Sequence, residues 1–269
     1  MHGASADALH ALTDDLKATV DGGADPARIA DDLFGVTALL RREPGLRRIA
    51  TDVSIGGEAK TGLLRGILGP RLSEASTDLV CRAASRRWSA TRDLADSLEQ
   101  AAVVAAVRSA EQDGRADDLE SELFAFERTV SGNPSLRDAL SDPARSVEDK
   151  RGLVRDLLGG RATAATLRLV EQSVSGSHRT VSVALEHYQK LAAEHRNRLV
   201  ATVRVARELS DRDAERLVQA LVRQYDRPVH LNTVVDPHVV GGVRVSIGDD
   251  VIDGTVSGRL ADARRQLAG

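Results

Sequence analysis

The sequence predicts a mainly α-helical protein, in which two tandem helical bundles are followed by a small α/β domain with a short β-sheet. Three observations lead to this fold class. The first part of the chain repeats itself at an offset of 90 residues, and both copies have apolar residues at helical spacing. Beyond about residue 195 the alternation typical of strands appears instead. We expect three domains, at residues 1–94, 95–195 and 196–269.

The repeat needs no gap. An offset of 90 residues brings Pro44 onto Pro134 and Lys60 onto Lys150. Further matches at this offset are Leu33-Phe34 with Leu123-Phe124, Leu46-Arg47 with Leu136-Arg137, Asp52 with Asp142, Gly62-Leu63 with Gly152-Leu153, and Leu68-Gly69 with Leu158-Gly159. A unit of this length is the size of a domain and is too long for a solenoid repeat.

Each copy has the pattern of a bundle of short antiparallel helices. One apolar stripe advances by four, three and four residues in both copies, as one face of a helix does. Its members are Ile29, Leu33, Val36 and Leu40 in the first copy and Leu119, Leu123, Phe126 and Val130 in the second. A second stripe ends at Gly69 or Gly159, where the residue after a helix is often glycine.

Residues 196–269 predict strands alternating with helices. Residues 199–206 and 229–233 read as strands, and Ser210 is suited to cap a helix between them. That helix has an apolar face made of Ala214, Leu217, Val218, Leu221, Val222 and Tyr225. The small α/β domain therefore begins with a strand, a helix and a second strand.

A hairpin is expected to follow. Residues 243–247 alternate as a strand, residues 248–250 predict a tight turn, and residues 251–252 predict a short second strand. A final amphipathic helix is expected, with one face formed by Val256, Leu260, Ala263 and Leu267.

The same stretch carries an ordered set of motifs. They are the Val235-Asp236-Pro237 turn, the Gly241-Gly242 pair, the Val243-Arg244-Val245 strand, the Gly248-Asp249 turn and the segment Val251-Ile252-Asp253-Gly254-Thr255. One such motif alone carries little weight, but the ordered set resembles the C-terminal signature of the delta subunit of F-type ATP synthase. That family includes the mitochondrial oligomycin-sensitivity-conferring protein.

The resemblance implies a non-catalytic peripheral-stalk, or stator, subunit of the proton-translocating synthase. In this family the helical domain binds the N-terminal helices of the alpha subunits, and the C-terminal domain binds the C-terminal end of the b subunit. The expected location is the cytoplasmic face of the plasma membrane, as a peripheral component. The family-matched candidates for partner binding are Asp236, Gly241, Gly242, Asp253 and Gly254. The alternative for each is a purely structural role.

The doubled bundle departs from the usual single bundle of the family, which resembles the region of Leu123, Pro134, Asp142 and Lys150 here. Long chains of this kind look like those of actinobacteria, some of which carry a fused b subunit in front. No membrane helix precedes the bundle here, so a separate b subunit is expected. As a hypothesis, the second copy keeps the usual contact and the first lengthens the stalk or adds a contact; the opposite assignment stays open.

Composition and motifs argue against several other functions. The net charge of −3 and the six aromatic residues offer neither the basic stripe nor the stacking platforms of a nucleic-acid-binding protein. No apolar run approaches the length of a membrane span, so direct membrane insertion is not expected. The single cysteine, Cys81, excludes an internal disulfide and is expected to be a small buried hydrophobe.

No catalytic, cofactor or metal site is expected. Residues 56–61 lack the glycine before Lys60 that a phosphate-binding loop needs, so Lys60 and Lys150 are interpreted as helix-start or surface cations. His187 and His195 have no metal-ligand pattern and are expected on the solvated surface. The alternatives that remain are a helical adaptor or scaffold not associated with the synthase, and an enzyme with a pocket between the bundle and the α/β domain.

Overall fold

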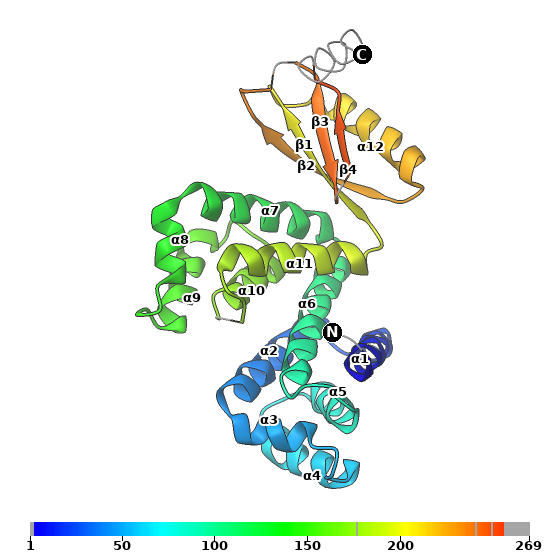
Figure 1. Ribbon diagram of the computed structural model, residues 1–269, viewed down its shortest axis with the longest axis vertical. Coiled ribbons are helices and arrows are strands. Elements are labelled where there is room, and N and C mark those ends of the chain that lie inside the picture. The colour runs from blue at the N-terminus through cyan, green and yellow to red at the C-terminus, as the bar shows by residue number, and fades with distance from the viewer. Residues whose placement is uncertain (1–2, 176, 240, 249, 256–269) are drawn as a thin grey trace, which may run out of the picture. The chain divides into compact units, whose positions relative to one another are not determined.

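The computed structural model describes residues 3–175, 177–239, 241–248 and 250–255 (Figure 1). The chain divides into two compact units, residues 1–192 and 193–269. The first unit is helical and the second contains a small sheet with a helix. This architecture confirms the predicted fold class. The expected last helix, with Val256, Leu260, Ala263 and Leu267, lies outside the described residues.

The helical unit repeats its elements at the offset found in the sequence. Its helices are α1 (Ala4–Asp21), α2 (Pro26–Arg42), α3 (Pro44–Thr51), α4 (Gly57–Leu68), α5 (Glu74–Ser85), α6 (Asp93–Gln112), α7 (Ala116–Gly132), α8 (Pro134–Ser141), α9 (Val147–Leu158), α10 (Ala164–Ser173) and α11 (Val181–His195). The bounds of α7, α8 and α9 are those of α2, α3 and α4 moved by 90 residues. The same offset carries α1 onto α6 and α6 onto α11 to within three residues at their starts.

Helix α6 therefore belongs to both copies, as the last helix of copy 1 (α1–α6) and the first helix of copy 2 (α6–α11). It packs against α1 and α2 of copy 1 and against α7 and α10 of copy 2. A helix that is covered on every side must be apolar or small all round. The residues of α6 meet that requirement, since its buried positions include Ala101, Ala102, Val103, Ala105, Ala106 and Val107.

The predicted apolar stripes form the core of this unit. All eight residues of the first stripe in the two copies are buried, with Leu33, Leu119, Leu123 and Val130 completely so. One continuous hydrophobic core runs from Ala8 to Ala192. The predicted boundary between residues 94 and 95 falls in the first turn of α6, and the division of the helical unit into two separate domains remains a prediction.

The hydrogen bonds at the start of the fifth helix are also repeated in both copies. The Ser73 hydroxyl caps α5 and its backbone N–H donates to Asp32 Oδ2 at 2.9 Å. At the offset of 90, the Thr163 hydroxyl caps α10 and its backbone N–H donates to Glu122 Oε2 at 2.8 Å. A carboxylate on the second helix of each copy thus anchors the start of the fifth helix.

The small α/β unit is built around a four-stranded mixed sheet with the order β2-β1-β3-β4. Its elements are β1 (Leu199–Val205), α12 (Asp211–Tyr225), β2 (Val229–Val235), β3 (Val243–Ile247) and β4 (Asp250–Asp253). β1 and β2 are parallel and are joined by α12, whereas β3 pairs antiparallel with both β1 and β4. The Ser210 hydroxyl caps α12 as predicted, accepting from the backbone N–H of Asp213 at 3.2 Å.

The core of this unit confirms the strand alternation. Val203 and Val245 face each other across β1 and β3 and are buried, with Leu221 of α12 in the same hydrophobic cluster. Leu217, Val222 and Tyr225 of the predicted apolar face also pack against this cluster. Among the described helices of the whole chain, none is long and apolar enough to cross a membrane.

Candidate interaction surfaces

Asp236 closes the end of β2. Its backbone N–H donates to Val205 O at 2.8 Å, which extends the ladder between β1 and β2 by one bond. Its Oδ1 accepts from the backbone N–H of His238 at 3.0 Å, the pattern of an Asx turn. Asp236 therefore turns the chain away from the sheet at the Asp-Pro step.

Gly242 and Gly254 make a close approach of two backbones at the base of the hairpin. Gly242 has φ of 78°, and a Cβ there would lie 2.3 Å from Gly254 O. The backbone N–H of Gly254 donates to Val243 O at 2.9 Å, and a Cβ at Gly254 would lie 3.1 Å from that oxygen. Gly241 also has a positive φ, of 63°. The glycines of the sequence motif are thus required by the backbone.

Asp253 fixes the segment after β4. Its Oδ1 accepts from the backbone N–H of Thr255 at 3.0 Å and from the Thr255 hydroxyl at 2.6 Å. These two hydrogen bonds lower the pKa of the Asp253 carboxyl. Gly242, Asp253 and Gly254 are brought together at the base of the β3–β4 hairpin. Asp236 lies at the same end of the sheet, because Val205 of β1 pairs with both Val235 and Val243.

The β4 strand beside these residues is exposed. Val251 and Ile252 are 53% and 37% exposed, and β4 is the last strand of the described sheet on that side. An exposed edge strand with apolar side chains offers both unpaired backbone groups and apolar surface to a partner. The sequence motif thus shapes a surface next to an exposed apolar edge.

In the helical unit, the Glu99 carboxylate joins the two copies. On one side, Arg41 of α2 donates to its Oε2 at 2.7 Å. On the other side, its Oε1 accepts from Gln172 Nε2 at 2.9 Å, from the Ser177 hydroxyl at 2.6 Å and from the Tyr188 hydroxyl at 2.8 Å. Glu99 is only 4% exposed, and its charge is compensated by Arg41 of copy 1 and by neutral hydrogen-bond donors of copy 2.

The electrostatics of this carboxylate follow from its partners. Burial alone would raise the pKa of Glu99, but the hydrogen bond and charge of Arg41, helped by Gln172 and Ser177, lower it to about 2. Burial and the neighbouring Glu99 charge raise the pKa of Tyr188 well above its ordinary value. Glu99 therefore stays ionised inside the protein at neutral pH.

His187 differs from the expectation of a solvated surface position. His187 lies beside His178, with ring centroids 5.2 Å apart, and both are partly buried next to Tyr188. His178 Nε2 is 3.9 Å from Glu99 Oε2. The neighbour of His187 could not be seen from the sequence spacing, because His178 lies in the loop before α11.

The position of Lys60 also differs from what the sequence predicted. It is the fourth residue of α4, as a helix-start cation would be, but it is 4% exposed and therefore not a surface cation. Its Nζ donates to Ala84 O at 2.9 Å, at the C-terminal end of α5, where a cation is favoured by the unpaired carbonyl groups. Cys81 is buried as predicted, and burial raises the pKa of its thiol.

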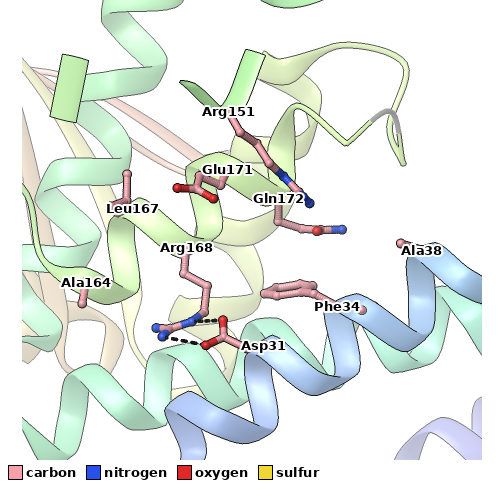
Figure 2. A pocket seen from close by; sticks show the side chains of 10 residues that line it. Asp31, Phe34, Ala38, Arg151, Ala164, Leu167, Arg168, Glu171 and Gln172 are labelled. Atoms are coloured by element: carbon pink, nitrogen blue, oxygen red, sulfur yellow. Dashed lines mark hydrogen bonds and ion pairs between the residues drawn. The ribbon is translucent and has the colours of Figure 1, made fainter. Parts of the chain in front are cut away.

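A cleft of about 460 Å³ lies between the copies (Figure 2). α2 forms one wall with Phe34, Gly35 and Ala38, and α9 and α10 form the other. The two walls are tied together by Arg168, which donates to both oxygens of Asp31 at 2.5 and 3.2 Å. We name this surface of α9 and α10 the copy-2 face.

Comparison with known proteins gives a consistent result. A family model described as ATP synthase delta (OSCP) subunit matches residues 102–267, more than half of the chain. The chain is 52% identical over 271 residues to the ATP synthase subunit delta of a Nocardioides species, covering 100% of this chain and 98% of that protein. It is 46% identical to the ATP synthase subunit delta of Streptomyces coelicolor, with the same coverage. The corresponding protein of Kineococcus radiotolerans is 47% identical over 92% of this chain and 90% of that protein.

Proposed function

The chain belongs to the family of ATP synthase delta (OSCP) subunits, and we propose that it joins the catalytic head to the b subunit within the peripheral stalk. Membership makes it a peripheral-stalk subunit of the F-type ATP synthase and a structural part of that enzyme complex. The similarity over the full chain is the observation that carries this conclusion. It does not favour a helical adaptor unrelated to the synthase.

Each of the two units is proposed to bind a different partner. The helical unit binds N-terminal helices of the alpha subunits, because furrows between helices accept an apolar or amphipathic helix. The α/β unit binds the C-terminal end of the b subunit at the surface around Asp236, Gly241, Gly242, Asp253 and Gly254. The exposed Val251 and Ile252 beside this surface support the assignment.

We further propose that the protein contributes no active site and works at the cytoplasmic face of the plasma membrane as a peripheral component. Lys60, Cys81 and Glu99 each have a partner within the helical unit, which supports a structural role for these three side chains. A stator has to hold while the rotor turns, so slow dissociation of its contacts matters more than fast association.

Purification of the tagged chain from gently solubilised membranes tests this function. We expect the alpha, beta and b subunits to copurify in fixed proportion, as identified by mass spectrometry. Recovery of the tagged chain without these subunits, with the tag accessible, would contradict the proposal.

A further inference from the structure

A second cleft, of about 680 Å³, lies on copy 1, and we name the surface that forms it the copy-1 face. It is lined by α4 and α5, together with Arg86 just after α5. Cys81 lies in its wall, and Arg65 and Arg82 stand on either side. Unlike the cleft in Figure 2, its lining includes no residue of a third helix.

The two faces occupy the same place in the repeat. Four residues that line the copy-1 face are related by the offset of 90 to four that line the copy-2 face. These pairs are Thr61 with Arg151, Asp78 with Arg168, Cys81 with Glu171, and Arg82 with Gln172. The structure therefore contains two versions of one helical surface, and only the copy-2 version has a helix of the other copy lining its cleft.

Helix α2 of copy 1 is the helix beside the copy-2 face. Gly35 and Ala38 of α2 line the cleft. Asp31 pairs with Arg168, as Figure 2 shows. The covering reduces the exposure of the Arg168 side chain to 18%. Its counterpart on the copy-1 face, Asp78, is 40% exposed, and Arg82 is 49% exposed. Within the described residues of the helical unit, α2 of copy 1 lines the copy-2 cleft, whereas the lining of the copy-1 cleft includes no residue of copy 2.

The charged side chains of the copy-1 face indicate which group of a partner it would bind. Arg65 is paired with Asp78 at 2.6 Å, and Arg86 is paired with Asp15 of α1 at 2.6 Å. Arg82 shares the same Asp15 at 3.5 Å, so three guanidinium groups face two carboxylates. An additional carboxylate would complete this set.

We propose that the copy-1 face receives a helix of a partner subunit in the way that the copy-2 face receives α2. The partner helix carries a carboxylate for Arg82 and Arg65, as Asp31 of α2 provides one for Arg168. The inference rests on the proposed function, because it makes copy 1 the part of the helical unit that grips the catalytic head. The copy-2 face, although it lies in the part matched by the family model, faces α2 of the same chain.

A matched pair of variants of the full-length protein tests the inference. Arg65 and Arg155 are repeat equivalents with similar exposure, 54% and 46%, and both are held by carboxylates. We expect Arg65→Glu to weaken binding to the purified catalytic head at least about tenfold and Arg155→Glu to change it less than about twofold. Circular dichroism of both variants checks that they fold. Equal binding of Arg65→Glu and the unchanged protein would overturn the inference, as would an equal loss with Arg155→Glu.

Alkylation of a cysteine placed on the copy-1 face supplies a second readout. Cys81 itself is buried and its thiol has a raised pKa, so the variant combines Cys81→Ala with Ser85→Cys, at an exposed position that lines the cleft. Binding of the catalytic head is expected to slow iodoacetamide labelling of the introduced thiol about tenfold, because it covers the cleft. An unchanged labelling rate in a complex that has formed would refute the inference and leave the proposed function standing. If the unchanged protein forms no complex with the head, the proposed function itself fails.

Discussion

At the scale of single residues, the Glu99 carboxylate is the polar centre of the helical unit. Its partners lie 58 to 89 positions away in the sequence, on α2, α10, the loop after α10, and α11. A carboxylate buried with Arg41 is expensive to disturb, because removing one partner leaves an uncompensated charge. Sequence patterns did not indicate this contact, since Glu99 occupies an ordinary helical position in a run of alanines and valines.

Replacing Glu99 by alanine is expected to lower the free energy of unfolding by about 3 kcal/mol, because Arg41, Gln172 and Tyr188 lose a shared acceptor. Urea unfolding followed by circular dichroism measures this change. The exposed Glu186 of α11 provides the control, and Glu186→Ala should change the free energy by less than about 0.5 kcal/mol. Equal effects of the two substitutions would contradict the role given to Glu99.

The low pKa of Glu99 also predicts a pH dependence. Its pKa of about 2 in the folded state lies below the ordinary value of 4.5, so the ionised form favours folding. This stability is complete above about pH 4.5 and is lost as the pH falls towards about 2, by up to about 3 kcal/mol. The titratable groups near Glu99 are Arg41, His178 and Tyr188, and Asp96 shares Arg41 with it.

Urea unfolding of the unchanged protein and of Glu99→Gln at pH 5 and pH 3 isolates this contribution. The difference in free energy between the two pH values should be smaller in Glu99→Gln, which cannot be protonated. The same difference in both proteins would show that Glu99 is not the group responsible.

At the scale of elements, most helices and strands could be predicted because their signals are local. Pro44 and Pro134, the apolar stripes and the alternation of β1 and β3 marked them in the sequence. Two relations were not predicted. The sharing of α6 escaped notice because α1 and α6 keep little residue identity at the offset of 90, and Lys60 was misjudged because its partner, Ala84 O, lies on another helix.

The β3–β4 hairpin depends on the close approach at Gly242. Gly242→Ala is expected to destabilise the α/β unit by about 2 kcal/mol, since its Cβ would meet Gly254 O at 2.3 Å and its φ is 78°. Gly248→Ala, with φ of 55° in open space, is the matched control and should cost only about 1 kcal/mol. Urea unfolding measures both, and a Gly248→Ala effect as large as that of Gly242→Ala would contradict the argument from close approach.

Replacing Gly35 of α2 by alanine is expected to stabilise the protein, in contrast to Gly242→Ala. A Cβ there meets nothing within 4 Å, and glycine in a helix is about 0.5 to 1 kcal/mol less favourable than alanine. Gly35→Ala is therefore expected to stabilise the helical unit by about that amount in thermal or urea unfolding. A loss of stability would show that α2 and the copy-2 face approach more closely than the structure indicates.

At the scale of the whole molecule, a shared helix suits a component that transmits mechanical load. Because α6 belongs to both copies and Glu99 ties their side chains together, the copies are not linked by a flexible connection within the helical unit. The family and the stator role could be predicted from the motifs between Val235 and Thr255. Which helices line the copy-1 and copy-2 faces could not be predicted, because this depends on which helices meet after folding.

Proton-driven ATP synthesis in membranes stripped of this subunit is the most direct test of the stator account. We predict that stripped membranes lose ATP synthesis while the released catalytic heads still hydrolyse ATP, and that adding back the purified chain restores synthesis. Undiminished ATP synthesis in membranes shown by mass spectrometry to lack the chain would contradict the account.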